Sequence, residues 1–153
     1  MLSQSNNIII DNMTVFHADD DSDDLEFFSD ALRRVSTEIN LVSYDQGSKL
    51  LESLHNPPPT PKMIFLDWNM PVINGPTILR QMMQSQNMKD IPVAILSTSD
   101  SQENIEEARK LGAKYFITKP KDFDKWVDAI KYCLTLDWES TCLNDHQFYH
   151  CGS

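Results

Sequence analysis

The sequence predicts an α/β fold in which a doubly wound, five-stranded parallel sheet carries helices on both faces. Five short apolar runs alternate with five amphipathic stretches, which is the order typical of parallel sheets. One of these runs, Met63–Leu66 (MIFL), is apolar on both faces, as a central parallel strand is. The length of 153 residues suits one such domain and is short for two.

The apolar runs predict the five strands of this sheet. In chain order the runs are Met13–Ala18, Asn40–Tyr44, Met63–Leu66, Pro92–Leu96 and Lys114–Thr118. A helical stretch follows each run, so each connection to a parallel neighbour is a crossover. Such crossovers are right-handed almost without exception.

Apolar residues at helical spacing predict the five helices. These helices are Ser22–Val35, Ser48–His55, Pro76–Gln86, Gln102–Leu111 and Asp122–Leu136. In the first helix, the buried stripe includes Leu25, Phe28 and Leu32, and Ser22 is the expected N-cap. Acidic residues in its first turn face the positive end of the helix dipole.

The charge of the chain excludes two classes of partner. With 13 Lys and Arg against 23 Asp and Glu, the net charge is −10. A nucleic-acid interface needs clustered positive charge to neutralise phosphates, and an anionic membrane attracts basic surfaces. Seven of the 23 acids fall between Asp19 and Asp30. Such a cluster indicates either a bound cation or a solvated helix start.

The sequence also predicts a cytoplasmic protein. No run of 18 apolar residues is present, and the N-terminus lacks the positive region of a secretory signal. The three cysteines, Cys133, Cys142 and Cys151, form neither a disulfide framework nor a zinc pattern, which favours reduced thiols.

We expect residues 1–12 to form an N-terminal extension, residues 13–136 to form the folded domain, and residues 137–153 to form a tail without an output domain. The tail shows no clear periodicity. It forms either a short extra element packed through Trp138 and Phe148 or a loose end.

Polar side chains follow four of the predicted strands. Asp19 and Asp20 follow the first strand, Asp67 the third, Ser97 the fourth and Lys119 the fifth. Ligands of open α/β sheets bind at the carboxyl ends of the strands, so we expect these side chains to converge there.

These residue types suit phosphoryl chemistry. Two or three carboxylates form a hard oxygen site for which Mg²⁺ is the natural ion. A carboxylate beside Mg²⁺ can attack phosphorus and become an aspartyl phosphate. A hydroxyl and an ammonium group can then bind the phosphoryl oxygens and neutralise their charge.

Four segments of the sequence resemble the receiver domain of bacterial two-component response regulators. They are FHADDDSDD, IFLDWNMPVING, PVAILSTSD and YFITKP, and the resemblance extends from Met13 to about Leu136. It implies a flavodoxin-like fold with strand order 2-1-3-4-5. The run DDDSDD and the lack of an output domain are similar to single-domain receivers related to those that partner bacterial phytochromes.

The resemblance implies a role for each matching residue. Asp67 would be the phosphoacceptor, and Asp19, Asp20 and Asp67 would hold Mg²⁺ together with the backbone carbonyl of Asn69. Ser97 and Lys119 would bind phosphoryl oxygens, and the Lys119–Pro120 peptide would be cis, as is typical of the family.

Two residues depart from the usual pattern. Phe116 occupies the aromatic switch position that often holds tyrosine, so it cannot signal through a phenol hydrogen bond. Trp68 is bulkier than the usual residue after the acceptor. It would either shield an acyl phosphate from water or contact a kinase.

Other residues near the motifs have ordinary structural explanations. Asp21, Asp23 and Asp24 are expected to be helix-start carboxylates rather than metal ligands. His17 lies inside the first strand and is expected to be a hydrogen-bonded core or edge histidine.

The resemblance implies a stand-alone response regulator that is not an enzyme in its own right. A histidine kinase or phosphotransfer protein would phosphorylate Asp67, and the output would be binding to another protein or passage along a relay. A homodimer through the face of the fourth and fifth helices is possible. The first alternative is a pseudo-receiver that binds partners without phosphoryl chemistry. The second is a small phosphohydrolase, but Asn69 stands where a general acid would be required.

Overall fold

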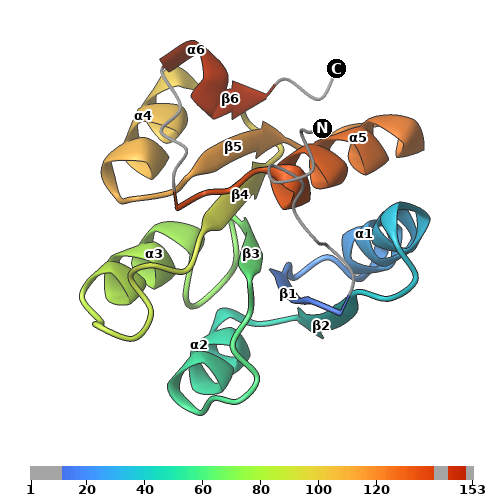
Figure 1. The fold of residues 1–153 in the computed structure, drawn as a ribbon. Helices are drawn as coiled ribbons and strands as arrows, with labels where there is room; N and C mark the ends of the chain where they lie inside the picture. The colour runs from blue at the N-terminus through green and yellow to red at the C-terminus, as the bar shows by residue number, and fades with distance from the viewer. Residues whose placement is uncertain (1–11, 140–144, 151–153) are drawn as a thin grey trace, which may run out of the picture.

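The computed structural model describes residues 12–139 and 145–150 and has a parallel sheet at its centre (Figure 1). The strands are β1 (Thr14–Ala18), β2 (Asn40–Tyr44), β3 (Met63–Asp67), β4 (Val93–Ser97), β5 (Tyr115–Thr118) and β6 (Tyr149–His150). Their order in the sheet is β2-β1-β3-β4-β5-β6. The predicted order 2-1-3-4-5 is therefore confirmed, and a short strand from the C-terminal segment extends it.

Helices cover both faces of the sheet (Figure 1). They are α1 (Ser22–Val35), α2 (Gly47–His55), α3 (Gly75–Met83), α4 (Gln102–Lys110), α5 (Phe123–Thr135) and the single-turn α6 (Asp145–Phe148). Helices α1 and α5 pack on one face, whereas α2, α3 and α4 pack on the other.

Strand β3 supplies both hydrophobic cores, because its successive side chains point to opposite faces. Ile64 and Leu66 belong to the core beneath α2 and α3, and Met63 and Phe65 belong to the core beneath α1 and α5. All four side chains are buried. This two-sided burial fixes the register of β3 and therefore the position of Asp67 at its end.

Helix α1 has the predicted bounds but a different N-cap, and α3 ends earlier than predicted, whereas the ends of α2, α4 and α5 differ from the predictions by one residue. Asp21, not Ser22, is the N-cap of α1, because its carboxylate accepts the backbone N–H groups of Asp23 and Asp24 at 2.8 and 3.2 Å. Helix α3 ends at Met83 rather than at Gln86, since the following amides bond three residues back in a tighter turn.

The C-terminal segment forms the packed element that was one of its two predicted states. Trp138 is buried, and its Nε1 donates to the carbonyl of Cys133 at 2.8 Å. Phe148 is also buried, with the Arg109 guanidinium 5.2 Å from its ring centre. Strand β6 pairs in parallel with β5, placing Tyr149 opposite Phe116. Two paired residues are too few for periodicity to predict.

The predicted N-terminal extension lies almost entirely outside the described residues, as do Cys142 and Cys151. No helix within residues 12–139 and 145–150 combines the length and apolar character needed to cross a membrane.

Candidate functional site

The acceptor candidate Asp67 is the last residue of β3 and is 4% exposed. The Trp68 N–H donates to Leu96 O at 2.8 Å, and the Gly75 N–H donates to Trp68 O at 3.0 Å. A Cβ atom on Gly75 would lie 2.9 Å from Asp67 O and from Trp68 Cα. Glycine is therefore required where the start of α3 returns onto the end of β3.

The acidic pair after β1 lies beside Asp67. Asp19 is fully buried, its N–H donates to Tyr44 O at 3.0 Å, and its Oδ1 accepts the Asp21 N–H at 3.0 Å. Asp20 is exposed. One carboxylate oxygen from each of Asp19, Asp20 and Asp67 lies within 4.8 Å of the others. The predicted convergence of these three side chains is thus present in the fold.

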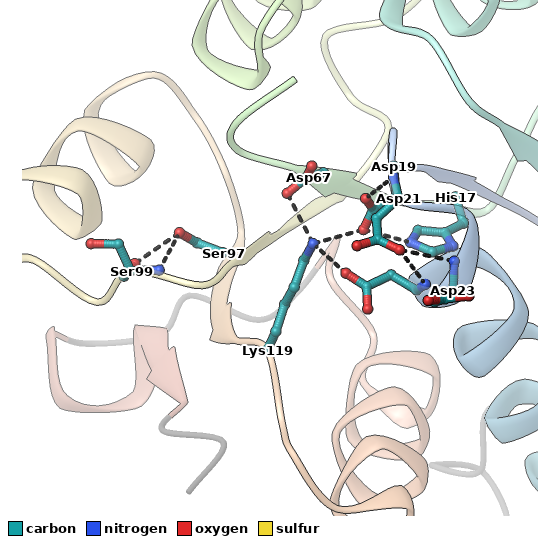
Figure 2. Close-up of polar contacts among 9 residues, drawn as sticks. His17, Asp19, Asp21, Asp23, Asp67, Ser97, Ser99 and Lys119 are labelled. Carbon is teal, nitrogen blue, oxygen red and sulfur yellow. Dashed lines mark hydrogen bonds and ion pairs between the residues drawn. The ribbon is translucent and has the colours of Figure 1, made fainter. Parts of the chain in front are cut away.

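Lys119 joins these carboxylates from the end of β5. Its Nζ lies 2.8 Å from Asp19 Oδ2, 2.8 Å from Asp24 Oδ2 and 3.3 Å from Asp67 Oδ1 (Figure 2). Its backbone N–H donates to Ser97 O at 2.7 Å, which anchors the end of β5 to β4. The ammonium group is therefore the shared counter-ion of a crowded acidic pocket.

The expected cis peptide at Lys119–Pro120 is wrong. The cis peptide bonds among the described residues are Pro57–Pro58 and Pro58–Pro59. The lysine side chain nevertheless points into the site, because its four methylene groups are long enough to bring Nζ to the carboxylates from this backbone.

Burial and charge crowding change the ionisation of the site. Burial, followed by the charge of Asp19, raises the pKa of Asp67 to about 7, although Lys119 opposes the shift. Burial also raises the pKa of Asp19. Burial alone would lower the pKa of Lys119, but hydrogen bonds to Asp19 and Asp24 and the charge of Asp67 raise it. The pocket thus favours an added positive charge.

Asp24 was predicted to be only a helix-start carboxylate, and that expectation is incomplete. Its backbone N–H does donate to the capping carboxylate of Asp21, but its Oδ2 also accepts a hydrogen bond from Lys119 Nζ at 2.8 Å. Its position in the first turn of α1 is the signal that could have indicated this contact, since this turn follows Asp19 and Asp20 directly.

His17 is buried as expected, but it is not hydrogen-bonded. Neither ring nitrogen has a hydrogen-bond partner in the described part of the chain, and the ring stacks on Phe28 with centroids 4.0 Å apart. Its Nε2 lies 3.9 Å from Asp19 Oδ2 (Figure 2). Burial, helped by the charge of Lys119, lowers the pKa of His17 to about 3, so the imidazole is neutral.

Ser97 ends β4 on the same edge but is engaged in its own loop. Its Oγ donates to Ser99 O at 2.8 Å and accepts the Ser99 N–H at 3.1 Å. Figure 2 shows the Ser97 side chain directed toward Ser99 rather than toward Asp67. A contact between Ser97 and a phosphoryl group on Asp67 therefore requires this loop to rearrange.

The two residues that depart from the usual motif pack against each other. Trp68 is 3% exposed, and its ring meets Phe116 edge-on with centroids 6.4 Å apart. Trp68 is therefore a core residue, and in this arrangement its ring is not available to a kinase. Phe116 is fully buried, and its role as a switch stays a prediction.

The donor set suits a small divalent cation. The three converging carboxylates are hard oxygen ligands of the kind that Mg²⁺ binds. In addition, the close cationic partner of the buried Asp19 Oδ2 among the described residues is Lys119 Nζ, at 2.8 Å. Asn69 is exposed beside the site, and the metal contact of its carbonyl stays a prediction.

A family model described as the response regulator receiver domain matches residues 15–131. The chain belongs to this family. Its sequence is 33% identical over 106 residues to the two-component response regulator ORR5 of Oryza sativa subsp. japonica, covering 69% of this chain and 77% of ORR5.

Solved structures agree with this assignment. The response regulator RPA3017, described in red light signaling of R. palustris, is 27% identical with a TM-score of 0.73, over 79% of this chain and 90% of that one. The phosphorylated cyanobacterial phytochrome response regulator RcpA shares the fold at 24% identity, with a TM-score of 0.74 over 86% and 97% of the two chains. The protein is thus a receiver of two-component signalling whose acidic cluster could hold a metal.

Proposed function

We propose that this receiver accepts a phosphoryl group on Asp67 from the phosphohistidine of a kinase or phosphotransfer protein. One observation carries the proposal: Asp67 ends a buried strand with carboxylates of Asp19 and Asp20 within 4.8 Å and with Lys119 Nζ at 3.3 Å. This arrangement combines a nucleophile, a cation site and a fixed positive charge.

In the proposed transfer, a carboxylate oxygen of Asp67 forms the new O–P bond while the N–P bond of the donor breaks. The imidazole nitrogen leaves with the bonding electrons and is protonated. Bound Mg²⁺ would supply charge neutralisation for the loose transition state. Asp19 and Asp20 would hold this ion with Asp67 and the Asn69 carbonyl, and Lys119 would exchange its carboxylate contacts for phosphoryl oxygens.

The signal would then arise from Ser97 and Phe116. Ser97 would release Ser99 and bind a phosphoryl oxygen, which moves the loop after β4. The buried Phe116 would follow this loop by rotation, because it has no hydroxyl of its own. The result would be a population shift between two packings of the α4–β5–α5 face.

In this role the protein would signal rather than turn over a substrate. Its only reactions would be its own phosphorylation and dephosphorylation, and its output would be phosphorylation-dependent contact with a protein target or relay. We place this exchange in the cytoplasm, where its kinase and its reduced thiols would be found. A homodimer through the α4–α5 face is a further prediction, and such a dimer would have to accommodate β6 beside β5.

The competing pseudo-receiver would keep the fold without the chemistry. The position of Lys119 between Asp19 and Asp67 weighs against it, because a binding module has no need for these buried charges. The phosphohydrolase alternative lacks a general acid, since the exposed Asn69 occupies that position.

The test is to incubate the protein with Mg²⁺ and either acetyl phosphate or beryllofluoride. We expect Mg²⁺-dependent phosphorylation, seen as a mass increase of one phosphoryl group, and beryllofluoride binding seen by fluorescence or NMR. Asp67→Asn should abolish both, and Asp20→Ala should weaken Mg²⁺ binding. Equal labelling of Asp67→Asn and wild type would show that Asp67 is not the acceptor.

A further inference from the structure

Tyr149 links the C-terminal strand to the two segments that carry Ser97 and Lys119. Its hydroxyl donates to Asp100 Oδ2 at 3.0 Å and lies 2.9 Å from Thr118 Oγ1. A phenol hydroxyl has one proton, and Tyr149 donates it in the hydrogen bond to Asp100. The Thr118 hydroxyl must therefore be the donor in the second contact. Tyr149 therefore bridges the loop after β4 and the end of β5.

Both partners of Tyr149 stand next to residues of the site. Asp100 belongs to the loop that begins after Ser97, and Thr118 immediately precedes Lys119. The Tyr149 ring also lies beside the buried Phe116, with ring centroids 6.0 Å apart. The C-terminal segment thus supplies a phenol hydroxyl near the residue that lacks one.

The loop after β4 is held from two sides in this arrangement. From within, Ser97 Oγ bonds the backbone of Ser99. From outside, Asp100 accepts the Tyr149 hydroxyl bond. Movement of Ser97 toward Asp67 must break the first contact. It also draws Asp100 away from Tyr149, since Asp100 directly follows Ser99 and β6 is fixed to β5.

We propose that Tyr149 is a positioning residue, which stabilises the resting arrangement of the β4–α4 loop and opposes binding of a phosphoryl group at Asp67. This inference rests on the proposed function. It goes beyond it by assigning regulation of the site to the C-terminal strand. By linkage, phosphorylation must loosen β6 to the same extent that β6 opposes phosphorylation.

The central experiment measures beryllofluoride affinity in saturating Mg²⁺ for the full chain and for Tyr149→Phe. Loss of one hydrogen bond of ordinary net strength should tighten beryllofluoride binding by about fivefold. Affinity for Mg²⁺ alone should not change, because the contacts of Tyr149 with Asp100, Thr118 and Phe116 leave the carboxylates of the cation site in place. A purely structural role would lower stability without this gain in affinity.

Tyr132→Phe is the matched control. Tyr132 is 39% exposed on α5, so the variant removes a phenol hydroxyl at a site away from the loop after β4. Its affinity for beryllofluoride should equal that of the wild type. Unchanged or weaker beryllofluoride binding in Tyr149→Phe would overturn the proposal.

A double-mutant cycle tests the specific contact. Asp100→Ala should also tighten beryllofluoride binding, whereas Tyr149→Phe in the Asp100→Ala background should add little, because both changes remove the same bond. Asp100→Asn keeps an oxygen acceptor and should stay closer to wild type. We call the Tyr149–Asp100 hydrogen bond, acting as a restraint on the loop after β4, the latch. Fully additive effects of the two substitutions would contradict it.

A second measurement separates failure of the latch from failure of the proposed function. Without Mg²⁺ or beryllofluoride, amide hydrogen exchange of Ser99 and Asp100 should be faster in Tyr149→Phe than in wild type or in Tyr132→Phe. Faster exchange without any beryllofluoride binding by wild type would refute phosphoryl acceptance and leave only the loop restraint. Unchanged exchange together with normal wild-type binding would refute the latch alone.

Discussion

At the scale of single residues, Lys119 organises the site before any phosphoryl group arrives. Its Nζ contacts Asp19, Asp24 and Asp67, and these contacts bring α1, β3 and β5 together at one point. Two of these carboxylates are also candidate metal ligands. Lys119 therefore competes with a divalent cation for the same oxygens, and this competition can be measured.

Lys119→Met should bind Mg²⁺ more tightly than wild type while losing affinity for beryllofluoride. Two like unit charges about 4 Å apart repel each other by about 4 kcal/mol at an effective dielectric constant of about 20. Removing even a fraction of this repulsion should raise the Mg²⁺ affinity by at least about fivefold. Isothermal titration calorimetry with Mg²⁺ measures the gain. Lys121→Met, the same change at an exposed lysine, is the control. Weaker Mg²⁺ binding in Lys119→Met would show that the ammonium organises the ligands more than it repels the ion.

At the scale of elements, the start of α1 illustrates a limit of sequence patterns. Both Asp21 and Ser22 are good N-cap residues, so composition alone does not decide between them. Asp21 caps the helix because β1 ends at Ala18 and the chain turns through Asp19, whose carboxylate accepts the Asp21 N–H. The capping residue is thus selected by the site that precedes the helix.

Asp21→Ala should lower the free energy of unfolding by about 1 kcal/mol, because two backbone N–H groups lose their acceptor. Ser22→Ala should leave it nearly unchanged, since Ser22 is already the first helical residue. Urea denaturation in the absence of Mg²⁺ measures both. Equal losses in the two variants would mean that the cap is shared between these residues.

The turn between β3 and α3 couples backbone packing to the site. In Gly75→Ala, the new Cβ would meet the backbone of Asp67 and Trp68 at 2.9 Å, so the end of β3 must shift. We expect a loss of about 1–3 kcal/mol of stability, typical of overpacking, together with weaker Mg²⁺ binding. Gly112→Ala, at φ +103°, should lose stability without changing Mg²⁺ affinity. Unchanged Mg²⁺ affinity in Gly75→Ala would contradict the coupling.

The same elements show how far the sequence predicts this protein. Hydrophobic periodicity predicts the strands and places Asp19, Asp67 and Lys119 at one edge, because parallel strands end together. It does not predict the Lys119–Asp24 contact, which depends on how α1 leaves the site. Nor does it predict the pairing of Tyr149 with β5, because a two-residue strand is stabilised by the exposed edge it meets rather than by its own pattern.

At the scale of the whole molecule, the net charge of −10 and the buried core both affect the equilibrium between the folded and the unfolded chain. The carboxylates of the site repel one another in the folded chain and separate when it unfolds. A cation that binds only the folded chain therefore stabilises the entire molecule. A buried group outside the site should report this stabilisation.

Cys133 is such a reporter. It is a free cysteine, fully buried in the core beneath α5, and burial raises the pKa of its thiol. In a Cys142→Ser/Cys151→Ser background, iodoacetamide should react with Cys133 only when the chain unfolds, because the thiolate is the reactive form. Mg²⁺ at about 100 times its dissociation constant should then slow alkylation by about 100-fold.

Mass spectrometry of the alkylated protein over time gives this rate directly. Adding Asp20→Ala to the same background should remove most of the Mg²⁺ effect, since this variant keeps the core but lacks one carboxylate of the cation site. Rapid alkylation without denaturant would contradict the burial of Cys133. Slow alkylation that Mg²⁺ does not change would show that Cys133 is reached through a local opening of α5, because such an opening leaves the site intact and is not opposed by the bound ion.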